Sequence, residues 1–367
     1  MKVVHLTAPE TISVRNIPVR CEFGPGELLL EPVLVGLTGS DLLRYRLGPP
    51  IVHGFRRPHI PGGEFVARVV ACGRGTASRK LLGKRVVGNP VCPCMKCEWC
   101  LEGNRHQCPN VRVLGWPPVN GAMRQRFAWP ADLCIEVPES MSGEVALLAA
   151  PLSLALSIVD NAHLPVMGKV AVLGAGQLGR MLIKILRAVG AGDVLSVDPN
   201  EYRRKLAVRH GATAAVDPYE SVEFVRQWPR KGADVSIDVT NASEGSREAV
   251  ATTRVGGHVI IAGIPRDNRI LFNARDARQK ELAMQFVRRP YKPLDRALQF
   301  LQLGTLAGIE ELVTHTFPME QAAEAYDLMR SRSDGVVKTI LEMPPYQPAE
   351  ESPARVYMEE AEEPRPS

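Results

Sequence analysis

The pattern of apolar and polar residues changes near Pro151. Before it, short apolar runs alternate with Gly and Pro, which is typical of β-strands separated by turns; these runs occupy residues 28–30, 65–70 and 85–87. After it, apolar runs at 170–173, 194–197, 235–239 and 258–262 alternate with helix-like segments at 178–189, 201–209 and 246–253. Because such alternation is the signature of βαβ units, the sequence predicts an α/β protein in which a mainly β domain precedes a doubly wound parallel sheet.

The same pattern gives the expected domain boundaries. We expect a β domain at 1–152, which includes a Cys-rich lobe at about 90–110, a nucleotide-binding domain at 153–298 and a C-terminal segment at 299–342. Further helices are expected at 294–303 and 319–331, and a last strand at 336–341. Residues 343–367 contain six Glu, two Arg and six Pro. Since this composition cannot bury enough apolar surface to offset chain entropy, we expect the end of the chain to be disordered.

Composition limits the class of protein and its partners. The chain has 367 residues and a net charge of +5, with 45 basic against 40 acidic side chains. No apolar run approaches the length of a membrane span, and the start lacks the pattern of a signal peptide, so we expect a cytoplasmic protein without a membrane partner. No block of Lys and Arg is longer than three residues, so we expect no nucleic acid partner; a small anionic cofactor or substrate fits the mild excess of charge.

A glycine-rich turn follows the first strand of the parallel sheet and opens an apolar helix. Its residues are Gly174-Ala175-Gly176-Gln177-Leu178-Gly179. This context is that of a dinucleotide fingerprint: Gly174 permits the tight turn, Gly176 a close approach to the pyrophosphate, and Gly179 close packing of helix on strand. The pyrophosphate would then lie at the helix N-terminus, near Gln177 and Leu178, where free N–H groups favour anions.

The next strand ends in Asp198, nineteen residues after Gly179. A carboxylate at this place accepts hydrogen bonds from the adenosine ribose, which favours NAD. Arg203 and Arg204 follow closely, and an arginine there can accommodate a 2′-phosphate, so NADP stays open.

Four of the eight cysteines have regular spacing, at Cys94, Cys97, Cys100 and Cys108. Four thiolates close a tetrahedral shell and leave no open position for water or substrate, which predicts one structural Zn(II) per chain. The spacing fits neither common ferredoxin pattern, and Cys92 is a spare thiol that makes the first ligand ambiguous.

From these motifs the chain resembles the zinc-type alcohol dehydrogenases of the medium-chain dehydrogenase/reductase superfamily, especially the sorbitol and threonine dehydrogenases. The matching segments are Gly36-Leu37-Thr38-Gly39-Ser40-Asp41, Pro61-Gly62-Gly63-Glu64, the four cysteines, Pro151-Leu152-Ser153 and the glycine-rich turn. The resemblance implies a GroES-like β domain closed by the C-terminal segment, a Rossmann domain between, and a homodimer or homotetramer. It also implies hydride transfer between NAD(P) and a small alcohol or carbonyl substrate. In the family, a basic side chain at the place of Lys338 contacts the cofactor pyrophosphate; a solvated lysine is the alternative.

The chain departs from this family at the catalytic zinc. The resemblance places ligands at three positions that here hold Thr38, Gly63 and Ala150, and a proton-relay His at the position of Leu43. Thr and Gly cannot replace thiolate and imidazole, and Glu64 alone cannot hold zinc, so we expect no normal catalytic zinc.

Three other residues are considered as replacement ligands. These are His53, His59 and Cys72. Since His59 lies four residues before Gly63, only a rearranged loop would bring it to the ligand position, and we expect an exposed loop histidine instead.

Without a metal, the polar groups left for catalysis are Ser40, Thr38 and Glu64. Ser40 matches the family hydroxyl that binds the substrate oxygen, and its alternative is the N-cap of a helix. Glu64 becomes a general acid if burial raises its pKa; otherwise we expect it to pair with an arginine. The nearby arginines are Arg56, Arg57 and Arg68.

These observations predict an NAD(P)(H)-dependent oxidoreductase with a structural zinc and no normal catalytic zinc. Its substrate would be a carbonyl, an imine or a conjugated alkene, in which the substrate itself delocalises charge. Two alternatives stay open: an alcohol or polyol dehydrogenase with an unusual metal site, and a nucleotide-binding pseudoenzyme without chemistry.

Overall fold

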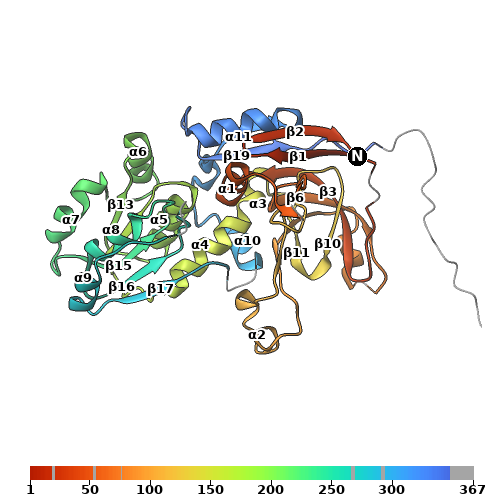
Figure 1. Cartoon of the computed structure of the whole chain (residues 1–367). Coiled ribbons are helices and arrows are strands. Elements are labelled where there is room, and N and C mark those ends of the chain that lie inside the picture. Colours follow the sequence, from red (N-terminus) through yellow and green to blue (C-terminus); the bar gives the residue numbers. More distant parts are fainter. Residues whose placement is uncertain (19–20, 53–54, 76, 266–268, 291–293, 348–367) are drawn as a thin grey trace, which may run out of the picture.

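The fold consists of two sheets joined by helices (Figure 1). The computed structural model describes residues 1–18, 21–52, 55–75, 77–265, 269–290 and 294–347. The first sheet builds the β domain and has the order β11-β7-β6-β3-β19-β18, with β10 beside β3. Its strands are β3 (Glu27–Gly36), β6 (Glu64–Cys72), β7 (Arg85–Gly88), β10 (Phe127–Pro130), β11 (Cys134–Glu136), β18 (Val313–Pro318) and β19 (Lys338–Glu342).

The central strand of this sheet is β3, which pairs antiparallel with β6, β10 and β19. Most of its side chains are buried, as expected for a strand with partners on both edges and a core beneath it. Its last residue, Gly36, lies opposite Glu64 of β6 and opposite Ile340 of β19. The start of β6 and the middle of β19 therefore lie on the two sides of the same residue of β3.

The second sheet is parallel and has the order β14-β13-β12-β15-β16-β17. Its strands are β12 (Val170–Leu173), β13 (Val194–Val197), β14 (Ala214–Val216), β15 (Ala233–Asp238), β16 (Thr253–Ile261) and β17 (Ala283–Phe286). The helices around it are α5 (Gln177–Ala188), α6 (Glu201–Arg209), α7 (Pro218–Arg226), α8 (Gly245–Thr252) and α9 (Ala274–Gln279). The strand order reverses between β12 and β15, and in open parallel sheets ligands bind at the carboxyl ends of the strands at such a point.

Helices between the two sheets give the molecule a continuous core (Figure 1). They are α3 (Gly143–Leu147), α4 (Ala149–Asn161) and α10 (Leu294–Gln302). One apolar cluster runs from Val66 and Val87 of the β domain through Leu152 of α4 to Val172 of the parallel sheet. The expected boundary at 152/153 falls inside α4.

Among the helices that the structure describes, none combines the length and apolarity that crossing a bilayer requires.

Smaller elements complete the described chain. They are the strands β1 (Lys2–Ala8), β2 (Thr11–Asn16), β4 (Ile51–Val52), β5 (Phe55–Arg56), β8 (Val91–Cys92) and β9 (Arg112–Val113), the helices α1 (Gly39–Leu47), α2 (Glu98–Leu101) and α11 (Ala322–Ser331), and the 3-10 turns η1 (Ala77–Leu81), η2 (Arg105–Gln107), η3 (Ala131–Leu133), η4 (Ile309–Leu312) and η5 (Met319–Gln321).

The expectation of disorder from residue 343 onward is wrong for the first five residues. Met343 is 7% exposed, and Tyr346 lies with its ring 3.9 Å from the Arg126 guanidinium. The Gln125 amide donates a 2.8 Å hydrogen bond to the carbonyl of Pro345. The partners of these residues, Gln125 and Arg126, lie about 220 residues earlier in the chain, and composition alone does not indicate contacts between such distant segments. Residues 348–367 lie outside the described chain.

Candidate active site

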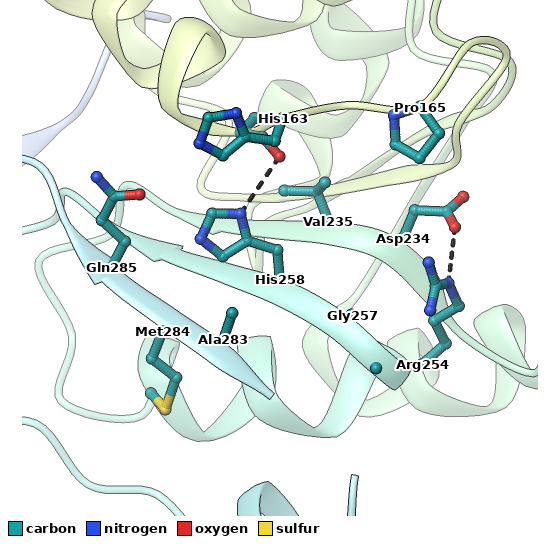
Figure 2. Close-up of a pocket in the computed structure, with 12 residues that line it drawn as sticks. His163, Pro165, Asp234, Val235, Arg254, Gly257, His258, Ala283, Met284 and Gln285 are labelled. Carbon is teal, nitrogen blue, oxygen red and sulfur yellow. Dashed lines mark hydrogen bonds and ion pairs between the residues drawn. The ribbon is translucent and has the colours of Figure 1, made fainter. Parts of the chain in front are cut away.

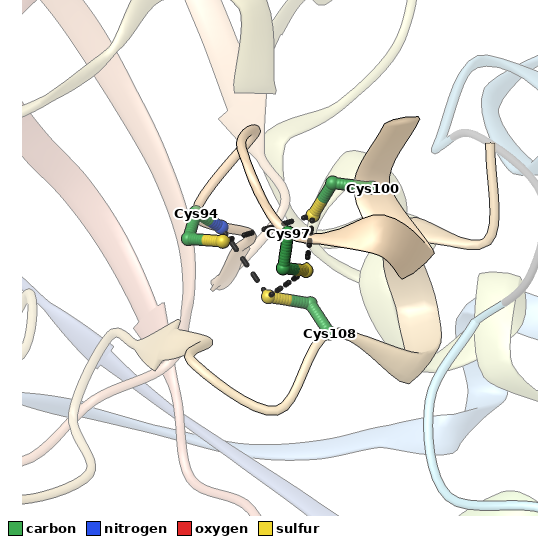
Figure 3. A group of neighbouring side chains, drawn as sticks. All are labelled: Cys94, Cys97, Cys100 and Cys108. Atoms are coloured by element: carbon green, nitrogen blue, oxygen red, sulfur yellow. Dashed lines mark hydrogen bonds between the residues drawn. The ribbon is translucent and has the colours of Figure 1, made fainter. Parts of the chain in front are cut away.

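The four spaced cysteines meet in a lobe between β8 and β9, with α2 inside it (Figure 3). Their ligand atoms all lie within 4.8 Å of one another, and the Sγ–Sγ distances include 3.5 Å for Cys97–Cys100 and 3.8 Å for Cys97–Cys108. Four sulfurs at the ordinary Zn–S bond length around a tetrahedral ion lie about 3.8 Å apart, so the donor set fits zinc. Cys92 is not part of the group, since its sulfur accepts a hydrogen bond from Arg112.

The glycine-rich turn lies between β12 and α5, at the carboxyl end of the parallel sheet. Gly174 has φ +101°, a left-handed conformation that side chains rarely adopt. A Cβ at Gly179 would overlap the carbonyl oxygen of Gly174. Gly176 is the N-cap of α5, gives it no side-chain cap, and has open space where a Cβ would stand. The first N–H groups of α5 therefore face a place that an anion can fill.

Polar groups beside this turn fit a dinucleotide. The Nε2 of Gln177 is buried and has no hydrogen-bond partner in the described chain. Leu178 packs against the large core cluster, which fixes the start of the helix. Asp198 is 5% exposed, and its two carboxylate oxygens accept the backbone N–H groups of Ala175 and Asn200, each within 2.9 Å. The end of β13 is thereby fastened to the turn.

At the start of α1 the structure forms a chain of hydroxyl groups. Thr38 is the N-cap, and its Oγ1 lies 2.7 Å from the Asp41 carboxylate and 2.7 Å from the Ser40 hydroxyl. The alternative of Ser40 as N-cap is therefore wrong: Ser40 lies inside α1 and is exposed. Asp41 is buried and also accepts the Gly62 N–H, and burial raises the pKa of this carboxyl.

Glu64 forms an ion pair that the sequence analysis did not foresee. Its carboxylate contacts the Lys338 ammonium, which is fully buried and donates a 2.9 Å hydrogen bond to the carbonyl of Leu37. Glu64 therefore pairs with a lysine and not with an arginine: Arg68 donates to the carbonyl of Gly83, and Arg56 donates to the carbonyls of Leu47 and Pro49. The alternative of a solvated Lys338 is also wrong, because this side chain is buried. Since its ammonium already contacts Glu64 and the carbonyl of Leu37, we do not retain Lys338 as a ligand of the cofactor pyrophosphate.

The ion pair crosses β3 at Gly36, which pairs with Glu64 of β6 on one side and with β19 on the other. The two side chains meet over this residue because it has no side chain: a Cβ there would lie 2.7 Å from Lys338 Cε and 3.1 Å from Glu64 Oε2. Burial raises the pKa of Glu64, and the charge and hydrogen bond of Lys338 oppose that shift.

The three positions that the resemblance assigns to catalytic-zinc ligands hold no usable donor. The Thr38 hydroxyl caps α1 and Ala150 offers a methyl group. At Gly63 there is no side chain, and a Cβ would make a tight contact of 3.1 Å with the carbonyl oxygen of Leu114. Within the described residues, the four-cysteine lobe is the one group of three or more metal-ligating side chains.

The replacement ligands do not gather here either. His59 is 2% exposed and lies 3.0 Å from the carbonyl of Gly115, so the expected exposed histidine is wrong. Burial lowers its pKa. Cys72 ends β6 while Glu64 begins it, and eight residues of strand separate them by about 26 Å. His53 lies outside the described residues.

A separate cavity of about 530 Å³ lies at the amino ends of β15, β16 and β17 (Figure 2). His163 and His258 stack at its wall, and Arg254 is paired with Asp234. Since the glycine-rich turn follows the carboxyl end of β12, this cavity lies at the opposite edge of the sheet and does not belong to the dinucleotide site.

Comparison with known proteins agrees with the two-domain fold. The family description "Alcohol dehydrogenase GroES-like domain" matches residues 24–139, and "Zinc-binding dehydrogenase" matches residues 178–302. An L-arabinitol 4-dehydrogenase from Aureobasidium melanogenum is 30% identical over 337 residues, which cover 89% of this chain and 90% of that protein. A sorbitol dehydrogenase from Bacillus subtilis (strain 168) is 28% identical over 332 residues, covering 89% of this chain and 93% of that protein. Alcohol dehydrogenase TADH from Thermus sp. ATN1 has a similar structure, with a TM-score of 0.84 at 26% identity, covering 94% of this chain and 100% of that one.

The buried pair can be tested by stability. We expect Lys338→Met to lower the free energy of unfolding by about 3–5 kcal/mol near neutral pH, because Glu64 is left buried and unpaired. The unpaired carboxyl has a raised pKa in the folded state, so the deficit shrinks as the pH falls and Glu64 becomes protonated. The measurement is denaturant unfolding at pH 5 and pH 8.

The matched control is the double variant Glu64→Gln/Lys338→Met, which removes both charges. It should recover most of the stability and show little dependence on pH. An equal loss in the single and double variants at both pH values would contradict the account of the pair.

Proposed function

Because the chain belongs to the zinc-type alcohol dehydrogenase branch of the medium-chain dehydrogenase/reductase superfamily and is an NAD(P)-dependent oxidoreductase, we propose that it transfers hydride without a catalytic metal. The substrate is a small carbonyl, imine or conjugated alkene. One structural zinc occupies the four-cysteine lobe. The dinucleotide supplies the carbon that gives or takes the hydride, and the protein supplies position and electrostatics.

The observation that carries this proposal is the ion pair at Glu64. The Lys338 ammonium lies against this carboxylate, and Thr38, Gly63 and Ala150 offer no thiolate, imidazole or carboxylate. A zinc ion would have to share that carboxylate with a fixed positive charge, which repels it. Among the described residues, no three metal-ligating side chains gather around Glu64, whereas catalytic zinc normally has three protein ligands.

In this account Ser40 binds the substrate oxygen. Its hydroxyl is exposed, whereas the Thr38 hydroxyl already donates to Asp41. Ser40 can therefore turn its hydrogen from Thr38 to a substrate oxygen, where negative charge develops on hydride transfer. Such a single donor is enough for a conjugated alkene, since the substrate's own carbonyl spreads the charge.

Thr38 and Glu64 act as positioning residues. Thr38 fixes the first turn of α1 through its reciprocal hydrogen bonds with Asp41. Glu64 holds the Lys338 ammonium against the carbonyl of Leu37, the residue directly before Thr38. The hydroxyl chain is thereby fixed in place before any substrate arrives, which is what efficient electrostatic stabilisation requires.

The zinc lobe has a structural role in this proposal. Arg289, which follows β17, donates to the carbonyls of His106 and Cys108 at 3.2 Å. A rigid lobe therefore links the β domain to the edge of the parallel sheet. That edge strand leaves Phe286 65% exposed, and together with the family resemblance it supports a homodimer or homotetramer.

Turnover of reduced cofactor is the experiment that tests the function. Oxidation of NADH and NADPH should be followed with a cyclic enone, an imine and a simple ketone, each with and without a chelator of accessible zinc. We expect turnover on at least the enone or the imine, and no effect of the chelator. Oxidation of simple secondary alcohols that stops with the chelator would favour a metal-dependent dehydrogenase, and cofactor binding without turnover on any substrate would favour a pseudoenzyme.

Ser40→Ala should lower kcat by about 10²-fold, the usual effect of losing one donor to a developing oxyanion. The fold should change little, because Ser40 is exposed and Thr38 keeps its bonds to Asp41. Steady-state kinetics on the best substrate measure the effect, and Ser40→Thr, which keeps the hydroxyl, should restore much of the rate. An unchanged kcat in Ser40→Ala would exclude Ser40 as the hydrogen-bond donor to the substrate oxygen.

A further inference from the structure

One arginine on the helix that bears Ser40 has no acidic partner. Arg44 lies in α1, one turn after Ser40, and its side chain is partly exposed. Within the described residues its Nε has no hydrogen-bond partner, and its Nη1 makes only a long contact of 3.4 Å with the carbonyl of Gly48. Burial lowers the pKa of Arg44, and no neighbouring carboxylate of the described chain offsets that shift. The guanidinium therefore keeps most of its donors for a group that the chain does not supply.

The indole of Trp116 restricts this guanidinium. Cζ of Arg44 lies 4.5 Å from the centroid of the Trp116 ring. Because the N–H groups of a guanidinium lie in its plane, an aromatic ring against one face leaves them at the edge, where they can donate. An arginine that is held in this way loses less side-chain entropy when its planar fork binds a carboxylate.

The loop that carries Trp116 adjoins the site around Ser40. The residue before Trp116, Gly115, packs against Gly62, since a Cβ at Gly115 would lie 2.8 Å from the carbonyl oxygen of Gly62. Gly62 in turn donates its N–H to Asp41, the residue after Ser40 in α1. The indole therefore borders the helix that presents the candidate catalytic hydroxyl.

Ser40 and Arg44 are four positions apart on α1, so they lie on one face of the helix, about 6 Å apart along its axis. We propose that Arg44, stacked on Trp116, binds a carboxylate group of the substrate while Ser40 binds the reacting oxygen. The inference rests on the proposed function and names its substrate class: a carbonyl compound or conjugated alkene that carries a carboxylate several bonds from the reacting carbon. A guanidinium meets such a group with two parallel charge-assisted hydrogen bonds. An uncharged substrate leaves it unpaired.

The test compares two enones, a benzylideneacetone with a para carboxylate and its methyl ester, which has a similar shape and no charge. Oxidation of NADH and NADPH by the full-length protein at neutral pH gives kcat and KM for each enone. We expect kcat/KM to be about tenfold higher or more for the carboxylate, as the net strength of hydrogen bonds to a charged group implies. The difference should lie mainly in KM, because the carboxylate is bound alike before and during hydride transfer.

Variants of α1 separate this contact from a general effect of charge. Arg44→Met should remove the advantage of the carboxylate, so that the two enones have equal kcat/KM. Arg44→Lys keeps the charge and loses the planar fork, and it should restore only part of the advantage. The matched control Arg46→Met removes a positive charge from the other side of α1 and should leave the advantage unchanged.

The possible outcomes distinguish this inference from the proposed function. Equal kcat/KM for the two enones in the unchanged protein would overturn the inference and leave the proposed function intact. An advantage that persists in Arg44→Met, or that Arg46→Met removes as well, would also overturn it. Because methionine keeps an apolar stem against Trp116, the thermal midpoint of Arg44→Met should stay close to that of the unchanged protein, and a large drop would show a structural role instead. If neither enone nor any other carbonyl is turned over, the proposed function falls and the inference falls with it.

Discussion

The contact between Lys338 and Glu64 is the interaction on which the site depends. It joins the last strand of the described chain, β19, to the start of β6 across Gly36 of β3. A buried ion pair is stable only if the remaining donors and acceptors are met, and here the Leu37 carbonyl meets one more N–H of the ammonium. The next residue, Thr38, begins α1. The pair therefore ties the residue before α1, the helix on which Ser40 lies, to β6 and β19, and it places a positive charge next to Glu64.

A site that stabilises the substrate oxygen with a hydroxyl group suits fewer substrates than a site with a metal. A metal acts as a Lewis acid and holds an alkoxide at neutral pH. A hydroxyl such as Ser40, supported by Thr38 and Asp41, stabilises an oxygen anion less strongly, so it suits substrates that delocalise their own charge.

The elements whose structure is set by neighbouring residues are the ones that could be predicted best from the sequence. Strands β12 and β13 have the predicted bounds, and α5 begins within one residue of its predicted start, because apolar periodicity and glycine turns act over a few residues. The four-cysteine lobe was likewise visible from spacing alone. Contacts between residues far apart in the sequence could not be predicted. Lys338 and Glu64 are 274 residues apart, and nothing near Lys338 in the chain indicates that its partner is a carboxylate rather than a cofactor phosphate or water. The burial of Met343 and His59 was missed for the same reason.

If hydride transfer in this protein needs no metal, the active protein contains only the zinc of the four-cysteine lobe, and its zinc content is the most direct test. Zinc per chain should be measured by elemental analysis on active protein purified without added metal or chelator, alongside Cys97→Ser. The account predicts one equivalent in the active protein and its loss in the variant, because the four-cysteine lobe holds the only zinc. Two equivalents, with one retained in Cys97→Ser, would contradict the account.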